Sequence, residues 1–220
     1  MAELIERLDP ARVRANVAEV RDEIAAAAAR AGRPPEAVEL VAAVKYVRME
    51  DLGALADAGV RVLGENRAQD LAVKAERWPG RFTWDFIGQL QSRKVKQVLP
   101  LVRWIHSVAS DSALAQLGRH GTGETEVLVE VNVAGEGEKA GIAPAELAGF
   151  LERCPVTVVG LMTMPPFATE PEASRPHFAA LRELAAAHGL RHLSMGTTQD
   201  FAVAVEEGAT LVRVGSRLYR

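Results

Sequence analysis

The feature that most constrains the fold is a regular alternation of short apolar runs with longer helix-forming segments. Eight runs read as strands, and each one except the last is followed by a segment typical of a helix. Strands that alternate with helices of this length pair in parallel. Eight such units predict a closed (β/α)8 TIM barrel, and an open doubly wound sheet is the alternative. The expected strands lie within residues 37–45, 60–66, 82–90, 102–110, 124–135, 156–166, 191–196 and 210–216.

An extra helix is expected before the first strand. Asp9 is a suitable N-cap, Pro10 suits the first helical position, and Gly32 ends an alanine-rich segment. Few residues follow the eighth strand, so we expect this N-terminal helix to cover that part of the barrel wall. With 220 residues, 48% of them hydrophobic, residues 1–220 are expected to form a single domain.

Charge and cysteine content exclude several classes of function. The formal net charge is −3, which gives no indication of a nucleic-acid partner or of an anionic membrane surface. The single cysteine, Cys154, rules out an internal disulfide and a multi-cysteine metal site, and we interpret it as a small apolar residue. The dispersed His177, His188 and His192 do not suggest a metal site either. Without a signal peptide or a membrane-spanning run, a cytoplasmic location is expected.

Lys45 stands at the end of the first predicted strand, where a buried ammonium would be costly. In TIM barrels the active site lies at the carboxyl ends of the strands. Side chains alternate along a strand, so Val41, Ala43 and Lys45 are expected on one face, with Tyr46 on the other. Either the Lys45 amine enters the barrel mouth and is used there, or the side chain snorkels to solvent.

Two loops at the same end of the predicted barrel suit an anion. Gly196, Thr197 and Thr198 follow the seventh strand, and Gly215 and Ser216 follow the eighth. Barrels often bind phosphate with the loops after these two strands. The alternative is ordinary, with glycine making a turn and the hydroxyl residues capping helices.

Other polar residues are placed near the same mouth. Arg213 lies within the eighth strand, where it needs an acceptor, and an internal salt bridge is the alternative to a ligand. Asn66 follows the second strand and either contacts a ligand or caps the next helix. Glu130 and Asn132 are both expected to face the barrel interior, for a structural or a ligand-linked reason. A reactive amine, a phosphate site and an arginine together suit a phosphorylated aldehyde, for which pyridoxal 5′-phosphate is the obvious candidate.

The chain resembles the pyridoxal-phosphate homeostasis proteins, which are single-domain relatives of the alanine racemase barrel. The resemblance covers nearly the whole sequence and depends on LVAAVK, LGENRAQD, WDFIGQLQSRKVKQV, IHSVAS, VNVAGEGEKAGI, GLMTMPP and HLSMGTTQDFAVAVEEGATLVRVGSRLY. It implies that Lys45 carries the cofactor as a Schiff base and that Arg213 approaches the pyridine nitrogen. It also implies the remaining cofactor-binding residues, which are the phosphate-holding Thr198, Gly215 and Ser216 and the pocket residues Asn66 and Met162.

The sequence departs from the family pattern at several positions. The lysine stands in AVKYV rather than in the usual Val-Ser-Lys-Thr context. Asp85 and Arg93 replace a usual histidine and a usual asparagine, and Thr198 replaces a common serine while keeping the hydroxyl. Cofactor binding is still expected with these differences, and they bear on what depends on the "QLQSRKVKQ" surface.

These residues favour a carrier over an enzyme. A guanidinium offers only donors, so Arg213 opposite the ring nitrogen would keep the pyridine unprotonated and a poor electron sink. Barrel racemases that resemble this chain add a β-rich domain and a tyrosine from a partner subunit, whereas Tyr46 is expected to face away and Tyr219 is terminal. We therefore expect no catalytic residue and a role in intracellular vitamin B6 homeostasis and cofactor delivery. The alternatives are a racemase or other slow pyridoxal-phosphate enzyme and, more distantly, an aldolase-type barrel.

Partners and secondary sites are less constrained. Apo pyridoxal-phosphate enzymes are the expected recipients of the cofactor, and the missing second domain favours a monomer. Lys94 and Lys96 are interpreted as a solvated helix face, with a second cofactor site or a docking patch as the alternative. His106, near the end of the fourth strand, is expected at the surface or in packing rather than in the pocket.

Overall fold

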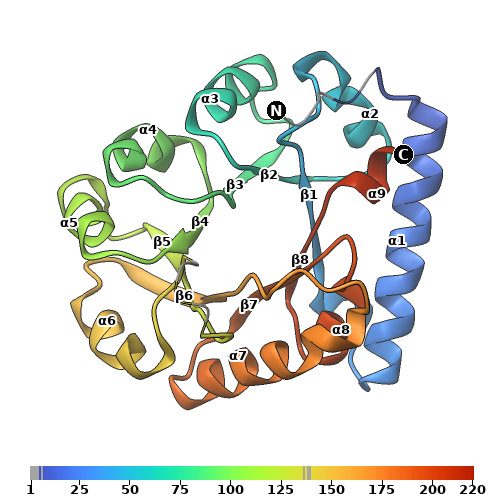
Figure 1. Ribbon diagram of the computed structural model, residues 1–220. Helices are drawn as coiled ribbons and strands as arrows, with labels where there is room; N and C mark the ends of the chain where they lie inside the picture. The colour runs from blue at the N-terminus through green and yellow to red at the C-terminus, as the bar shows by residue number, and fades with distance from the viewer. Residues whose placement is uncertain (1–4, 6, 136, 138–139) are drawn as a thin grey trace.

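Eight parallel strands close into a barrel in the computed structural model, which describes residues 5, 7–135, 137 and 140–220 (Figure 1). The strands follow one another around the ring in sequence order. This confirms the predicted TIM barrel. The strands are β1 Glu39–Ala43, β2 Val62–Glu65, β3 Thr83–Phe86, β4 Trp104–Val108, β5 Glu126–Glu130, β6 Thr157–Met162, β7 His192–Thr197 and β8 Leu211–Val214.

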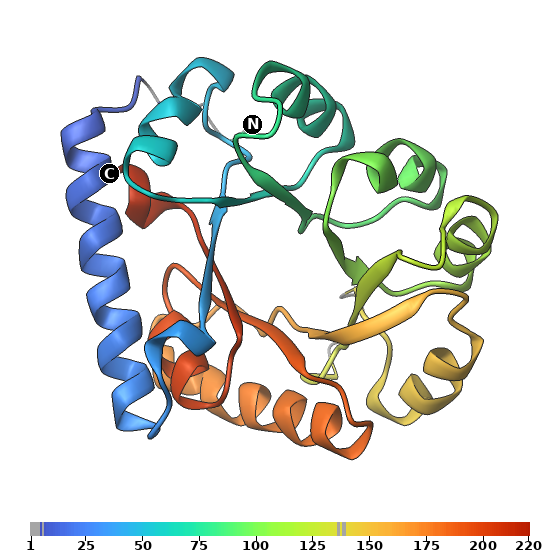
Figure 2. The same ribbon diagram turned by 180° about the vertical axis from the view of Figure 1, so that it is seen from behind.

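Helices form the outer layer of the barrel, as the view from behind also shows (Figure 2). The α-helices are α1 Pro10–Arg30, α2 Leu52–Asp57, α3 Ala68–Arg77, α4 Val95–Val98, α5 Asp111–His120, α6 Leu147–Arg153, α7 Arg175–Ala187, α8 Phe201–Glu206 and α9 Ser216–Tyr219. Short 3-10 turns are η1 Pro35–Ala37, η2 Met49–Asp51, η3 Ser92–Lys94, η4 Leu99–Leu101, η5 Pro144–Glu146 and η6 Pro171–Ser174. None of the helices in these described segments has the length and apolar content needed to cross a membrane.

The apolar side chains form two cores. The larger lies between the barrel and the helices, and the smaller fills the barrel interior with Val41, Val62, Leu128 and Leu211. The ring closes where β1 pairs with β8, in a register that sets Val41 beside Arg213. An apolar interior layer therefore lies directly next to the arginine that the sequence placed at the barrel mouth.

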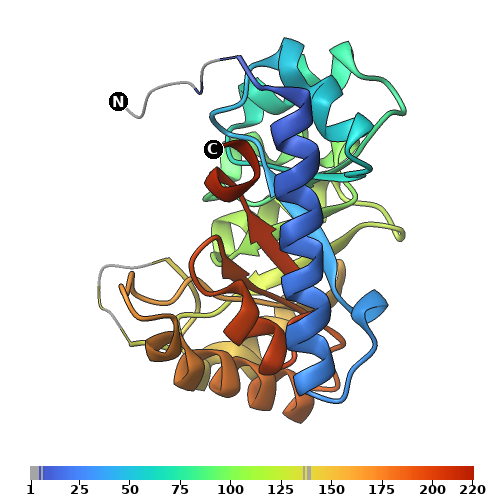
Figure 3. The same ribbon diagram turned by 90° about the vertical axis from the view of Figure 1, so that its right-hand side faces the viewer.

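Helix α1 closes the barrel wall, as predicted. Its N-cap is Asp9, whose carboxylate accepts the Ala11 N–H at 2.9 Å. Val13, Val17, Val20 and Ile24 recur at helical spacing and are buried, each contributing roughly 1.5–3 kcal/mol through removal from water. Figure 3 shows α1 running along the outside of the barrel, beside the short helices α8 and α9. The single turn α9 is thus covered by a helix from the opposite end of the chain.

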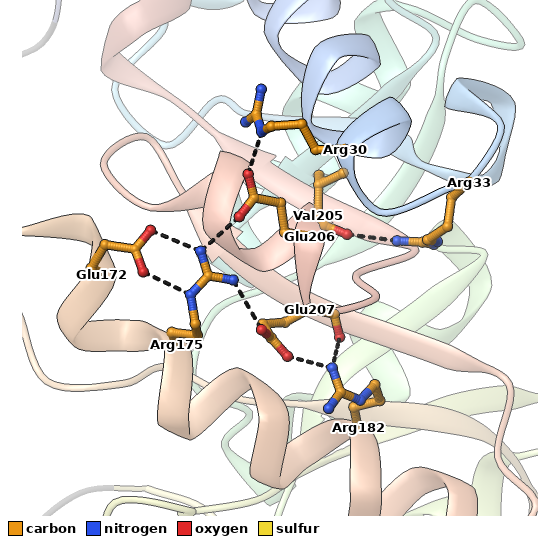
Figure 4. A network of polar contacts seen from close by, with 8 residues as sticks. All are labelled: Arg30, Arg33, Glu172, Arg175, Arg182, Val205, Glu206 and Glu207. Carbon is orange, nitrogen blue, oxygen red and sulfur yellow. Dashed lines mark hydrogen bonds and ion pairs between the residues drawn. The ribbon is translucent and has the colours of Figure 1, made fainter.

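A network of ion pairs joins α1, η6, α7 and α8 (Figure 4). Glu206 accepts from Arg30 at 2.6 Å and from Arg175 at 2.6 Å, while Glu207 accepts from Arg175 at 2.9 Å and pairs with Arg182. Networks of this kind are more effective than isolated surface pairs, because each ordered side chain serves several partners.

Candidate functional site

A cavity of about 640 Å³ lies at the carboxyl ends of the strands, where the sequence predicted the site. Its lining combines residues that follow β1, β2, β6, β7 and β8. Six of the seven predicted cofactor-binding residues line it, namely Lys45, Asn66, Thr198, Arg213, Gly215 and Ser216. The seventh, Met162, is buried at the end of β6 and is outside this lining, whereas Met164 is part of it. Contact of Met162 with a cofactor stays a prediction.

Lys45 lies in a turn two residues beyond the end of β1, rather than within the strand. As expected, Val41 faces the barrel interior, and Ala43 and Lys45 both line the cavity. The expectation for Tyr46 was wrong, because its ring also lines the cavity and its centroid is 4.7 Å from Lys45 Nζ. The alternation of faces ends with the strand at Ala43, and the Val47 N–H then bonds back to the Val44 carbonyl at 3.0 Å.

A buried ion pair connects the Lys45 turn to the Asn66 turn. Glu65 is fully buried and its carboxylate lies 2.6 Å from Lys74 Nζ, which also donates to the Val44 carbonyl at 2.7 Å. The other Glu65 oxygen accepts the Asn66 N–H at 2.6 Å and the Arg67 N–H at 3.2 Å. One carboxylate and one ammonium therefore hold the backbone on both sides of the cavity.

Asn66 does not cap α3, whose N-cap is Arg67. Its side-chain oxygen is buried and has no hydrogen-bond partner in the described structure. The backbone beside it is tightly packed, because a Cβ at Gly88 would lie 2.2 Å from the Asn66 carbonyl oxygen. A buried polar atom without a partner is costly in a folded protein. Such an atom in a cavity wall is well suited to contact a ligand.

The loops after β7 and β8 are hydrogen-bonded to each other. The Thr198 hydroxyl accepts the Gly215 N–H at 3.1 Å, and Asp200 accepts the Thr197 N–H at 2.7 Å. Gly196 has a φ of 88° and ends up within β7, where a Cβ would lie 2.5 Å from the Ala204 Cβ. Glycine is therefore required to turn the chain toward Thr198.

Arg213 is buried without an ion pair in the described structure, so the internal salt bridge is not what holds it. It donates to the Ser194 hydroxyl at 2.5 Å, to the Thr163 carbonyl at 2.9 Å and to the Met164 sulfur at 2.9 Å. These contacts use three of the five donors of a guanidinium. Burial lowers the pKa of Arg213 to about 10, against the opposing charges of Glu130 and Asp200, so the group is still cationic at neutral pH.

A chain of buried polar groups continues from Arg213 through the barrel. His106 Nδ1 lies 2.8 Å from the Ser194 hydroxyl, and His106 Nε2 lies 3.2 Å from an Asp85 oxygen that also pairs with Arg103 at 2.6 Å. Burial lowers the pKa of His106 despite the Asp85 carboxylate, so the ring is neutral. The geometry assigns the proton to Nε2, where it points at Asp85, and leaves Nδ1 to accept from Ser194.

His106 is buried outside the cavity lining, which agrees with the expected packing role and not with a surface role, and it also makes two buried hydrogen bonds. In this series of hydrogen bonds, Arg213 donates to Ser194, Ser194 to His106 and His106 to Asp85, which orients the guanidinium at the cavity. Burial raises the pKa of Asp85, but its hydrogen bonds with His106 and Arg103 and the positive charge of Arg103 outweigh this and bring the pKa below its usual value. Asp85, at the position where the resembling family usually has histidine, is therefore a buried anion in this chain.

The remaining predicted residues give mixed results. Glu130 is buried as expected, and burial raises its pKa despite the charge of Arg213. Tyr219 was expected to be only a terminal residue, but it lines the cavity and its hydroxyl donates to the Ala43 carbonyl at 3.0 Å. Burial, together with the charge of Glu65, raises the Tyr219 pKa, so the phenol stays protonated. Cys154 is half-buried and is a free thiol, and burial raises its pKa.

Several residues that matter to the site were missed from the sequence. The cavity lining also includes Ile87 and Gln199, and the supporting contacts come from Glu65, Lys74 and Ser194. Glu65 could have been noticed because a carboxylate interrupts an apolar strand directly before Asn66. Within the described part of the chain, no group of three or more acidic, histidine or cysteine side chains is arranged to hold a metal ion.

Comparison with known proteins gives the same assignment over almost the whole chain. Residues 9–220 match the family described as alanine racemase, N-terminal domain. A protein of Aquifex aeolicus named pyridoxal phosphate homeostasis protein is 39% identical over 214 residues, covering 91% of this chain and 94% of its own. The Escherichia coli protein of the same name is 34% identical over 223 residues, covering 93% and 94%.

Solved structures show the same fold. PipY of Synechococcus elongatus, determined with PLP bound, is 31% identical and has a TM-score of 0.76, covering 91% of this chain and all of its own. Alanine racemase from Corynebacterium glutamicum, at 14% identity and a TM-score of 0.77, shares the barrel fold with 63% of its own chain covered. The chain therefore belongs to the alanine racemase N-terminal domain family and, within it, to the pyridoxal phosphate homeostasis proteins.

Proposed function

We propose that this protein binds pyridoxal 5′-phosphate as a Schiff base on Lys45 and serves as a carrier in vitamin B6 homeostasis. The observation that carries the proposal is a single cavity that combines the Lys45 amine, the cationic Arg213 and the linked Thr198 and Gly215 loops. The naming of the relatives and the PLP-bound PipY structure support the same ligand. Residues 1–220 would act as one cofactor-binding domain.

The residues present fit this cofactor. The aldehyde would condense with the Lys45 amine, forming a C=N bond and releasing one water. Thr198, Gly215 and Ser216 would hold the phosphate, and Arg213 would face the pyridine nitrogen. The unpartnered Asn66 amide oxygen is a group that a ligand in this cavity would satisfy. Met162, at the end of β6, is also proposed to contact the cofactor.

A carrier role follows from the properties of Arg213 and Tyr219. Because Arg213 is a donor-only cation, a pyridine nitrogen facing it stays unprotonated, and the electron withdrawal that amino-acid chemistry needs is weakened. Tyr219 is protonated and already donates to the Ala43 carbonyl, so it is not a ready base. The protein would hold the reactive aldehyde and release it to apo-enzymes. A cytoplasmic, monomeric carrier is part of this proposal.

The test is the visible absorption spectrum of the purified protein with added pyridoxal phosphate, followed by borohydride reduction and peptide mass mapping. We expect a Schiff-base band and a reduced adduct on Lys45, both lost in Lys45→Ala. The matched control is Lys96→Ala, which removes an exposed lysine outside the cavity. No band, or an adduct on another lysine, would overturn the assignment. Transfer is tested by reactivation of an apo-enzyme with the loaded protein while a scavenger removes free aldehyde.

One observation favours a second candidate, a racemase or other slow pyridoxal-phosphate enzyme. The centroid of the Tyr46 ring lies 4.7 Å from Lys45 Nζ. A phenol is therefore close to the amine, although the sequence predicted that Tyr46 faces away from it. If Tyr46 acts as an acid or base, the loaded protein should exchange the α-proton of an amino acid in D₂O. Lys45→Ala and Tyr46→Phe should both abolish that exchange. Absence of exchange with a panel of amino acids would leave the carrier role alone.

A further inference from the structure

A second cavity, of about 570 Å³, adjoins the proposed cofactor cavity and shares Asn66 with it. It lies between the start of α3 and the segment formed by η3 and α4. Three cationic side chains line it, Arg67, Arg93 and Lys94, and none of the described residues in the lining is acidic. Its volume is within the range of small-molecule sites in proteins.

The cationic side chains of this cavity make their hydrogen bonds mainly with neutral groups. Arg93 Nε and Nη2 donate to the Gln91 side-chain oxygen at 3.2 and 3.1 Å, and Lys94 Nζ lies 3.4 Å from the Gln97 side-chain oxygen. An amide oxygen accepts a hydrogen bond but does not neutralise a cation. Among the residues that the structure describes, only Arg67 of these three cations has a carboxylate nearby, with Asp70 at 3.6 Å and both groups exposed. The cavity therefore has an excess of positive charge that attracts anions.

The neutral lining also suits an oxyanion. Gln69, Gln89, Gln91 and Gln97 bring four carboxamides to the cavity, each with two N–H donors, of which one on Gln97 is used by the Ala68 carbonyl at 3.4 Å. A phosphate has several acceptor oxygens, which match a guanidinium fork, an ammonium and such amides. Phe86 contributes a small apolar wall. These features favour a small phosphorylated ligand over an apolar or cationic one.

We propose that this cavity is a second ligand site, which binds a small phosphate monoester or pyrophosphate independently of Lys45. Lys94 is then a ligand-binding residue, in place of the solvated face expected from the sequence, whereas Lys96 is exposed and lies outside the lining. The two lysines provide a matched pair, because they belong to the same short helical segment and carry the same charge.

The experiment titrates Lys45→Ala protein, which cannot form a Schiff base, with sodium pyrophosphate and with phenyl phosphate. Binding is followed by calorimetry and by the NMR shifts of backbone amides and glutamine side-chain amides. We expect shifts at Gln69, Gln89, Gln91 or Gln97, and affinity reduced on the order of tenfold or more by Arg93→Ala with Lys94→Ala. Adding Lys96→Ala instead should leave the affinity within about twofold, since Lys96 lies outside the lining of this cavity. Circular dichroism verifies that each variant is folded.

Three results with the phosphate probes would overturn the proposal. These are absence of binding, equal weakening by the Arg93/Lys94 double variant and the Lys96 variant, and shifts confined to Thr198 and Gly215, which would mean that the probes enter the cofactor cavity. Preference for an acidic peptide over both phosphate probes would also overturn it, since the site would then be a protein-docking surface. Because Lys45 is absent throughout, failure here leaves the borohydride test of the cofactor assignment unaffected.

Discussion

The buried Glu65–Lys74 pair is the feature whose removal should most affect the site. Lys74→Met keeps the length of the side chain but removes the ammonium that lies 2.6 Å from Glu65 and 2.7 Å from the Val44 carbonyl. Glu65 is fully buried, so its carboxylate would keep only the two backbone N–H bonds that it already accepts. Breaking a buried ion pair by removing one partner costs about 3–5 kcal/mol.

The free energy of unfolding can be measured in urea and the Tm by thermal unfolding, both followed through tryptophan fluorescence. A chain of this size shifts its Tm by about 2–4 °C per kcal/mol, so Lys74→Met should unfold roughly 6–20 °C below the wild type. Combining it with Glu65→Gln removes the unpaired charge while keeping an oxygen for the Asn66 and Arg67 N–H groups. The double variant should therefore be more stable than Lys74→Met alone, with a coupling of about 1–3 kcal/mol.

The same single and double variants can also be tested for function. Lys74 fixes the carbonyl directly before Lys45, so its loss should weaken retention of pyridoxal phosphate, measured as the rate at which the Schiff-base band decays in the presence of an aldehyde scavenger. If the two substitutions add without coupling, or if Lys74→Met unfolds like the wild type, the pair does not brace the site. An unchanged decay rate in a clearly destabilised variant would separate the stability role from the positioning role.

Three further predictions concern other parts of the structure. Gly196→Ala should lower the free energy of unfolding in urea by about 2–4 kcal/mol, because φ is 88° and the new Cβ would lie 2.5 Å from the Ala204 Cβ. The control Gly189→Ala, at φ 65° and with open space around it, should lower it by about 1–2 kcal/mol. Equal losses would contradict the packing argument. Burial holds the His106 pKa below its ordinary value, so the unfolded chain binds the extra proton and stability should fall as the pH drops below about 6.5, by up to about 1.4 kcal/mol per unit. His106→Gln should remove this component in unfolding measured at several pH values, and an unchanged slope would refute it. Arg175→Ala should cost about 1 kcal/mol at low salt and less in 1 M NaCl, and a loss that salt does not reduce would show that packing, not charge, holds α7 to α8.

The barrel was predictable because its signal is repeated eight times, so an error in one unit does not change the architecture. The ends of the elements were less predictable, since they depend on local hydrogen bonds that composition does not reveal. Lys45 shows the difference. The apolar run continues to Val44, yet the strand ends at Ala43, and the turn that follows brings Tyr46 into the cavity.

The site was predictable where a residue type and its place in the barrel agree, as for Lys45, Arg213 and the Thr198 and Gly215 loops. It was not predictable where partners meet across the fold. His106 and Asp85 lie on neighbouring strands, but Ser194 is 88 residues from His106 and completes the chain to Arg213. Similarly, two methionines stand two residues apart in β6 and the loop after it, and only the packing decides that Met164 reaches the cavity.

The closure of the barrel wall by α1 has a consequence for how the protein is made. Val13, Val17, Val20 and Ile24 leave the ribosome well before the helices α8 and α9, which pack against α1. Arg217 and its ion-pair partner Glu23 are 194 residues apart in the chain. At about 5–20 residues per second, the apolar stripe of α1 waits on the order of ten seconds or more for its partners. During this interval the stripe of α1 that packs on α8 and α9 is open to chaperones and to premature association.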